Sequence, residues 1–289
     1  MNWFYFALVS MFFLVIRSLL EKKTLKINNQ IQFLTIFYFF NALLVLPLIS
    51  KIDFFLSYKE LFLIISVGIL SVVSIYCSIS LIKYFELSFS KPIGSLNSIF
   101  VLLLAFFFLD ESINMLQILG VMIILVISFL FIKDEAKITK NTIKGLFKSK
   151  YGIYLIFAVI FGSVCTILDR IILKTVEPLT FLFLSRYVLL SLFLIIVFTR
   201  INGIKEITKS FRSSSFIIFI IALMNIGIVY FYNLALAETV AKTGLVAVIR
   251  SSSLVFAVVF GGLLFKEKDI LHKIILSLIL IFGLYLIII

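Results

Sequence analysis

Two arginines stand near the middle of long apolar stretches, where a charged side chain is expensive to place. They are Arg186 and Arg250. A cation at the centre of a bilayer costs about 3 kcal/mol or more, so an ionisable residue there is a candidate functional residue. No acid is expected at their depth, because Asp169, Glu111 and Glu267 lie at the ends of apolar stretches. We therefore expect both arginines to bind an anionic or carboxylate-bearing substrate. Two other interpretations stay open, namely bonding to carbonyls freed at helix breaks and snorkelling towards the membrane surface.

Charged residues at the ends of the apolar stretches form a second group. Arg17 and Glu21 are four residues apart, which puts them on one helix face and predicts a local ion pair. Asp169 is expected to pair with a basic residue of another helix or to relay a proton, because its neighbour Arg170 points elsewhere. Arg17 and Asp169 are therefore candidates for coupling or gating, with a purely structural corner pair as the alternative in each case.

Uncharged polar side chains within apolar stretches make a third group. They are Asn41, Asn97, Asn225, Asn233, Tyr38, Tyr76, Tyr187 and Tyr230. Amides and phenols can line a wet cavity, or they can bond one another across helices. The substrate-binding candidates that we select from this group are Asn97, Asn225, Tyr76, Tyr230 and Tyr38.

Residues for metal, redox or hydrolytic chemistry are sparse. Cys77 and Cys165 both lie inside apolar stretches, and His272 is the only histidine. The chain contains no GxSxG or HExxH motif and no nucleotide-binding motif. We therefore expect no catalytic residues, no metal site and no cofactor.

Composition assigns these residues to a membrane protein. Hydrophobic residues make up 63% of the 289 residues and charged residues 14%, whereas a soluble domain is about half apolar and a quarter charged. Ten apolar stretches have about the 20 residues that a helix needs to cross a bilayer. They span 2–20, 31–50, 60–82, 88–109, 113–132, 152–173, 177–199, 214–236, 240–265 and 270–289. The expected fold is an all-α polytopic membrane protein with ten transmembrane helices.

An internal repeat divides the chain in two. Leu19–Leu34 (LLEKKTLKINNQIQFL) recurs 148 residues later as Ile167–Leu182 (ILDRIILKTVEPLTFL). A second pair of similar stretches aligns Glu111 with Glu267. The basic linker 133–150 separates five expected helices from five, either as an amphipathic surface helix or as a solvated loop.

An odd number of helices in each half reverses the orientation of the second half. The chain therefore predicts two inverted five-helix repeats, the arrangement of many secondary transporters. The expected domains are 1–132 and 151–289, joined by the linker 133–150.

Particular stretches resemble a known family. FFLDES followed by LQILGVMIILV, together with GLVAVIRSSSLVFAVVFGGLLFKEKD, is similar to the drug/metabolite transporter superfamily and its ten-helix EamA-type members. FLFLSRYVLL resembles the arginine-bearing seventh helix of that family. The resemblance implies a pathway surrounded by all helices except the fifth and tenth. The chain departs from the family in that Tyr38 stands 148 residues before Arg186, where a paired arginine would lie.

The basic residues predict an orientation. Eighteen of the 26 lysines and arginines lie in the loops after the first, third, fifth, seventh and ninth expected helices, and four lie in the other loops. Basic loops stay in the cytoplasm, which would put both termini outside. The family resemblance implies the opposite, with cytoplasmic termini. The same clustering in short loops makes membrane topology, rather than nucleic-acid binding, the expected reason for the net charge of +12.

The sequence thus predicts a secondary transporter of a small polar metabolite that works by alternating access. The substrate is expected to be anionic, amino-acid-like or phosphorylated. A flippase for a lipid-linked sugar or phosphate is the alternative within transport, and a membrane-embedded enzyme or a scaffold is the alternative outside it. The expected setting is the plasma (inner) membrane, as a multi-pass monomer or homodimer whose partners are the substrate and the lipid bilayer.

Overall fold

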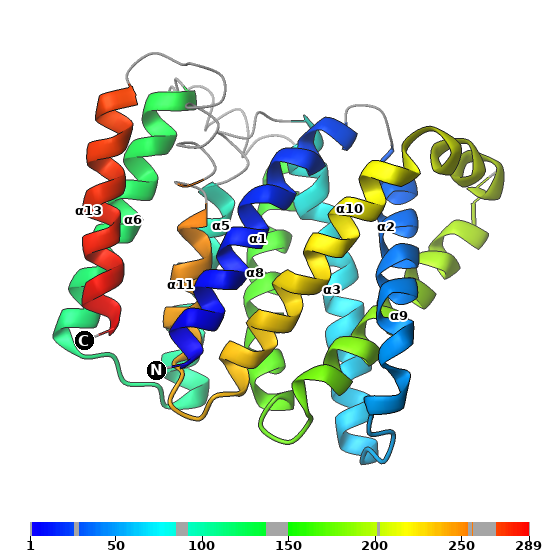
Figure 1. The fold of residues 1–289 in the computed structure, drawn as a ribbon, viewed down its shortest axis with the longest axis horizontal. Helices are drawn as coiled ribbons and strands as arrows, with labels where there is room; N and C mark the ends of the chain where they lie inside the picture. The colour runs from blue at the N-terminus through cyan, green and yellow to red at the C-terminus, as the bar shows by residue number, and fades with distance from the viewer. Residues whose placement is uncertain are drawn as a thin grey trace.

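The chain folds as a bundle of helices packed side by side (Figure 1). The computed structural model describes residues 2–25, 29–84, 92–136, 150–200, 203–253, 256 and 270–288. The helices in these ranges are α1 (Asn2–Leu25), α2 (Gln30–Val45), α3 (Tyr58–Tyr84), α5 (Pro92–Leu109), α6 (Met115–Ala136), α8 (Lys150–Ile172), α9 (Pro178–Phe198), α10 (Gly203–Ala237), α11 (Thr243–Ser251) and α13 (Ile270–Ile288). A 3₁₀ helix, η1 (Leu46–Lys51), extends α2, and none of the described residues forms a strand.

These helices confirm the expected all-α polytopic membrane fold with two inverted repeats. Five of them contain apolar segments long enough to cross a bilayer, in α2–η1, α3, α8, α9 and α10. Shorter apolar segments lie in α1, α5 and α6. A helix is the expected solution in lipid, because it satisfies every interior backbone group within its own segment.

Two helices differ from the expected bounds. The eighth was expected from residue 214, but α10 begins at Gly203 and continues through the amphipathic segment GIKEITKSFRS. The ninth was expected over 240–265; the helix α11 begins at Thr243 and ends at Ser251, and most of the expected stretch beyond Ser253 lies outside the described residues. Most of the linker 133–150 lies outside the described residues. So does Glu267, which the sequence comparison aligned with Glu111.

Helix packing repeats when the two halves are exchanged. The pair α1–α10 corresponds to α8–α3, the pair α2–α10 to α9–α3, and the pair α1–α11 to α8–α5. The pairs α2–α9, α5–α11 and α6–α13 join equivalent helices of the two halves. In Figure 1, α1 and α8 run in opposite directions, as an inverted repeat requires.

The repeated sequence occupies equivalent places in the two halves. Helix α2 begins at Gln30 and α9 begins 148 residues later, at Pro178. Three repeated apolar pairs are buried in both copies: Leu25 and Leu173, Phe33 and Phe181, and Leu34 and Leu182. The repeat therefore preserves both a helix boundary and the residues that pack around it.

The helices α6 and α13 form one edge of the bundle (Figure 1). They cross at Gly120 and Gly283, where a Cβ added to Gly120 would lie only 2.6 Å from the carbonyl oxygen of Gly283. Small residues at a crossing let helices approach closely in lipid. This pair agrees with the expected role of the fifth and tenth helices as supports.

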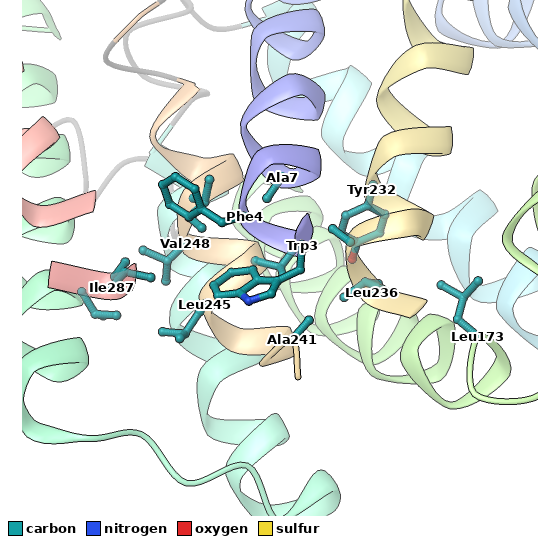
Figure 2. Packing of buried hydrophobic residues seen from close by; sticks show 14 of the residues in the cluster. Trp3, Phe4, Ala7, Leu173, Tyr232, Leu236, Ala241, Leu245, Val248 and Ile287 are labelled. Carbon is teal, nitrogen blue, oxygen red and sulfur yellow. The ribbon is translucent and has the colours of Figure 1, made fainter. Parts of the chain in front are cut away.

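A buried apolar cluster joins α1, α10 and α11 beside the polar residues of the bundle (Figure 2). Trp3 from the start of α1 lies near Leu245 of α11, and Tyr232 projects from α10 on the other side of α1. This apolar packing fixes α1, α10 and α11, the three helices that carry the candidate residues Arg17, Asn225 and Arg250.

Candidate functional site

Arg250 comes from the last turn of α11 and lies against an aromatic ring. Its guanidinium carbon is 4.0 Å from the centroid of the Tyr232 ring, close enough for a strong cation–π interaction. The Nε of Arg250 is buried without a hydrogen-bond partner among the described residues.

Arg186 lies at the middle of α9 and faces the middle of α2. It is 8% exposed, and its guanidinium carbon is 5.8 Å from the centroid of the Tyr38 ring. Its described hydrogen bond is a long one, from Nη2 to the Ser185 hydroxyl at 3.4 Å, and its Nε has no partner among the described residues. Because buried donors are nearly always satisfied, these open positions indicate water or a ligand.

Asp169 lies within electrostatic range of the two arginines, although no acid was expected at their depth. The charges of both Arg186 and Arg250 act on its carboxylate, although Asp169 lies near the end of α8. The side chain is only partly buried by accessible surface. Helices tilt and cross in the bundle, so depth counted along one helix does not fix depth in the assembly. Arg186, Arg250 and Asp169 together carry a net charge of +1 if all three are ionised.

The expected pair of Arg17 and Glu21 is confirmed and belongs to a larger network. Arg17 Nη2 donates to Glu21 Oε1 at 2.8 Å, and Nη1 donates to Asn225 Oδ1 at 2.6 Å. Asn225 Nδ2 donates in turn to Asn41 Oδ1 at 2.7 Å, and Asn41 Nδ2 donates to the carbonyl of Phe37. The network ties α1 to α10 and α2, so Asn225 is held by protein groups.

Tyr38 lies between the two charged groups. The charges of Arg186, Arg17 and Glu21 all act on its hydroxyl. Tyr38 is also the residue 148 positions before Arg186, and Glu21 is 148 positions before Asp169. The inverted repeat therefore supplies one acid and one central polar residue from each half. The two acids differ in their contacts. Glu21 forms a direct ion pair with Arg17, whereas Asp169 experiences the charges of two arginines.

Glu111 holds the beginning of α11, the helix that carries Arg250. Its Oε1 accepts from the Thr243 backbone N–H at 2.9 Å and from the Thr243 hydroxyl at 2.7 Å. Its Oε2 accepts from the Gly244 N–H at 3.3 Å. A carboxylate at a helix start satisfies free N–H groups and faces the positive end of the helix dipole. Nothing in the local sequence indicated this contact, because the cap comes from a residue 132 positions away.

Arg170 has a structural role. Its guanidinium donates to the backbone carbonyls of Leu236, Glu238, Thr239 and Ala241. These carbonyls belong to the end of α10 and its connection to α11. Arg170 thereby fixes the connection between α10, which carries Tyr232, and α11, which carries Arg250. The adjacent Asp169 does not take part in these hydrogen bonds and experiences the charges of the two arginines instead.

Three of the selected candidates make their described contacts elsewhere. Asn97 accepts a hydrogen bond from Ser163 at 2.9 Å, where α5 meets α8. Tyr76 packs edge-on against Tyr154. Tyr230 belongs to an apolar cluster around the end of α2 and the start of α9. The structure thus brings together Arg186, Arg250, Asp169 and Tyr38, with Arg17 and Asn225 in the adjoining network.

Tyr232 and Asn41 contribute to these groups but were not selected as binding residues from the sequence. Tyr232 and Asn41 become recognisable only by their neighbours, Arg250 and Asn225. The described residues contain no group of three or more His, Cys, Asp or Glu side chains that could hold a metal ion.

The helix topology and buried charges define a polytopic membrane protein built from inverted repeats. The chain belongs to the EamA-like transporter family, which it matches over residues 1–133 and 149–289. It is therefore a membrane transporter of the drug/metabolite type, and the members of this family are transporters rather than enzymes.

Solved structures share the fold. One of them, titled only "Crystal structure of protein", matches with a TM-score of 0.68 and 10% sequence identity over 97% of this chain and 95% of its own. A likeness at this identity speaks to the fold alone. Among curated proteins, none matches the chain.

Proposed function

We propose that the protein is a secondary transporter of a small polar metabolite that carries a net negative charge. The observation that supports this is a pair of arginines, Arg186 and Arg250, that lie against aromatic rings and whose buried Nε atoms have no hydrogen-bond partner among the described residues. The excess positive charge and the free Nε donors suit a carboxylate or phosphate that the guanidinium groups bind. Tyr38 and Tyr232 would add aromatic faces beside the ligand.

Alternating access would rock one five-helix half against the other about the α2–α9 contact. Glu21 lies near the end of α1 and Asp169 near the end of α8, and these two helices run in opposite directions (Figure 1). The pair of Arg17 and Glu21 is therefore a candidate gate for one side of the membrane, and the pair of Asp169 and Arg250 is a candidate gate for the other. The direct 2.8 Å ion pair of Arg17 and Glu21 corresponds to a closed gate. Asp169 has no such direct ion pair among the described residues, so its side would be the one from which a ligand enters.

Asp169 is also the candidate for coupling. In the absence of substrate its carboxylate would neutralise part of the charge on Arg186 and Arg250. An arriving anion would replace it, and the displaced carboxylate would then take a proton more readily. The groups that face it are Arg186 on α9, Arg250 on α11 and Tyr232 on α10, with Cys165 one turn earlier on α8.

Ligand-induced thermal stabilisation tests the proposal. Purified protein in detergent would be heated with monocarboxylates, amino acids and sugar phosphates, and each hit would be followed as uptake into liposomes. Arg250→Leu should abolish the shift without lowering the unfolding temperature, because it removes a costly buried charge. Arg250→Lys should weaken the shift, since the lysine keeps the charge but loses the planar fork.

Lys59→Leu is the control, because Lys59 is an exposed cation at the start of α3, outside both proposed sites. It should leave both the shift and the unfolding temperature unchanged. If Arg250→Leu unfolds the protein and the wild type shows no shift with any anion, Arg250 is structural and the proposal fails. A shift produced only by lipid-linked phosphates would favour the flippase instead.

Two further expectations stay proposals. The plasma membrane is the expected location, and the protein is expected to work as a monomer or homodimer. Fractionation of membranes and mass measurement in detergent would check them.

A further inference from the structure

A cavity lies on the outside of the bundle, away from Arg186 and Arg250. It is a crevice of about 430 Å³ between α2, α9 and α10, at the end of the bundle where α9 passes into α10. Apolar side chains form nearly all of its lining, among them Phe39, Leu194, Val197, Ile207 and Phe211. Its volume falls within the range of small-molecule sites, which is about 300–1,000 Å³.

The walls of the crevice are held in place. Phe211 of α10 stacks on Phe40 of α2 with ring centroids 5.5 Å apart, and it meets Phe39 edge-on. Ser210 donates a 2.7 Å hydrogen bond to Gln32 at the start of α2. These contacts join the beginning of α10 to α2, so the hollow is bordered by fixed contacts on that side.

The crevice opens onto the outer surface of the bundle, and its lining has few polar groups for water. An apolar hollow without polar partners does not hold water, and an empty one loses packing contacts along its whole lining. Phe39 and Phe211 are 45% and 40% exposed at its border, so the lining continues onto the outer surface of the bundle. An alkyl chain of a bilayer lipid needs no polar partner, and it can enter the hollow from the outer surface of the bundle.

Charge at the adjacent end of the helices selects the kind of lipid. The segment 200–212 carries Arg200, Lys205, Lys209 and Arg212 with a single acid, Glu206. Arg200 is exposed just after the end of α9, and the other basic residues belong to the first turns of α10, in the same stretch of sequence as Ile207 and Phe211 of the lining. Basic residues next to a membrane attract anionic headgroups.

We propose that this crevice is a binding site for an anionic phospholipid, with one acyl chain between α2, α9 and α10 and the phosphate among the basic residues of 200–212. The site is distinct from the charged site for the transported metabolite and does not depend on that assignment. Because its walls come from both halves of the repeat, a bound lipid joins α2 to α9 and α10 and stabilises the present arrangement.

Native mass spectrometry tests the proposal. Full-length protein would be equilibrated with equal amounts of dioleoyl phosphatidylglycerol and dioleoyl phosphatidylcholine, and the retained lipid would be counted. Phosphatidylglycerol should be retained at least about fivefold better, the factor that one basic residue contributes at an anionic surface. The triple variant Lys205→Gln, Lys209→Gln and Arg212→Gln should remove this preference. Lys51→Gln with Lys174→Gln, at the other end of the bundle, should preserve it.

Filling the crevice gives an independent readout. Ile207→Trp should lower retention of both lipids, whereas Leu103→Trp, on an exposed position of α5, should not. If Ile207→Trp does not fold, Leu194→Trp fills the same space from α9. Equal retention of the two lipids by the wild type, or unchanged retention in the filled variant, overturns the site. A dimer that disappears in the filled variant would mean that a second copy of the chain occupies the crevice instead.

Discussion

Removing the cap that Glu111 provides should destabilise α11 and the protein with it. The Glu111 carboxylate accepts from the Thr243 N–H, the Thr243 hydroxyl and the Gly244 N–H, at 2.9, 2.7 and 3.3 Å. A hydrogen bond to a charged group contributes about 1.5–3 kcal/mol, and the helix dipole adds up to about 1 kcal/mol at a partly exposed site. Since water can replace part of this, we expect Glu111→Ala to cost about 3 kcal/mol.

Glu111→Gln is the milder version of the same change. It keeps one carbonyl oxygen for the Thr243 N–H but loses the charge and the second acceptor, so the expected cost is about 1–2 kcal/mol. For a protein of this size a loss of 1 kcal/mol lowers the unfolding temperature by roughly 2 °C. The assay is thermal unfolding in detergent, followed by intrinsic fluorescence.

Glu60→Gln is the matched control. Glu60 also caps a helix start, accepting from the Ser57 N–H and hydroxyl at 2.8 Å, but these groups are exposed and local. Its loss should lower the unfolding temperature much less than Glu111→Gln does, because water replaces an exposed cap. A double-mutant cycle of Glu111→Gln with Thr243→Ala should show a coupling above about 0.5 kcal/mol. If the two changes add independently, or if Glu111→Ala leaves the unfolding temperature unchanged, the cap is not a stabilising contact.

Four other outcomes can be measured. Gly120→Val places a side chain against the facing carbonyl of α13 and should lower stability by about 2 kcal/mol in the same unfolding assay. Arg17→Leu should cost about 3 kcal/mol because it leaves Glu21 buried without its partner, and most of that loss should return in the variant with both residues changed to Leu. Asp169→Asn should flatten the pH profile of uptake into liposomes, and a profile identical to wild type would remove Asp169 from coupling. A periplasmic reporter fused after Ile289 should be active if the charge bias sets orientation, whereas a glowing fluorescent protein there would favour cytoplasmic termini.

The sequence alone determined the class, the helix number and the repeat. Apolar length and composition decide these features, because a bilayer accepts only segments that satisfy their own backbone groups. The 148-residue offset between Gln30 and Pro178 even gave equivalent helix starts. Arg186 and Arg250 could also be selected in advance, since a cation within an apolar stretch is conspicuous without any knowledge of its neighbours.

Helix bounds were predicted less well where composition changes within a helix. The beginning of α10 carries Lys205, Glu206 and Lys209, so a hydropathy criterion placed the start at residue 214. A helix continues for as long as its backbone bonds are satisfied, and leaving the apolar part of the membrane does not end it. The same early turns of α10 form part of the peripheral crevice.

Tertiary structure alone decided which charges meet. Depth counted along α8 placed Asp169 far from both arginines. The charges of Arg186 on α9 and Arg250 on α11 nevertheless act on its carboxylate. Arg170, beside it in sequence, turns to the carbonyls at the end of α10. Coulomb interactions and hydrogen bonds depend on distances between helices, and those distances follow from the packing of apolar faces far apart in the chain. A single sequence records the side chains of that packing but not their separations.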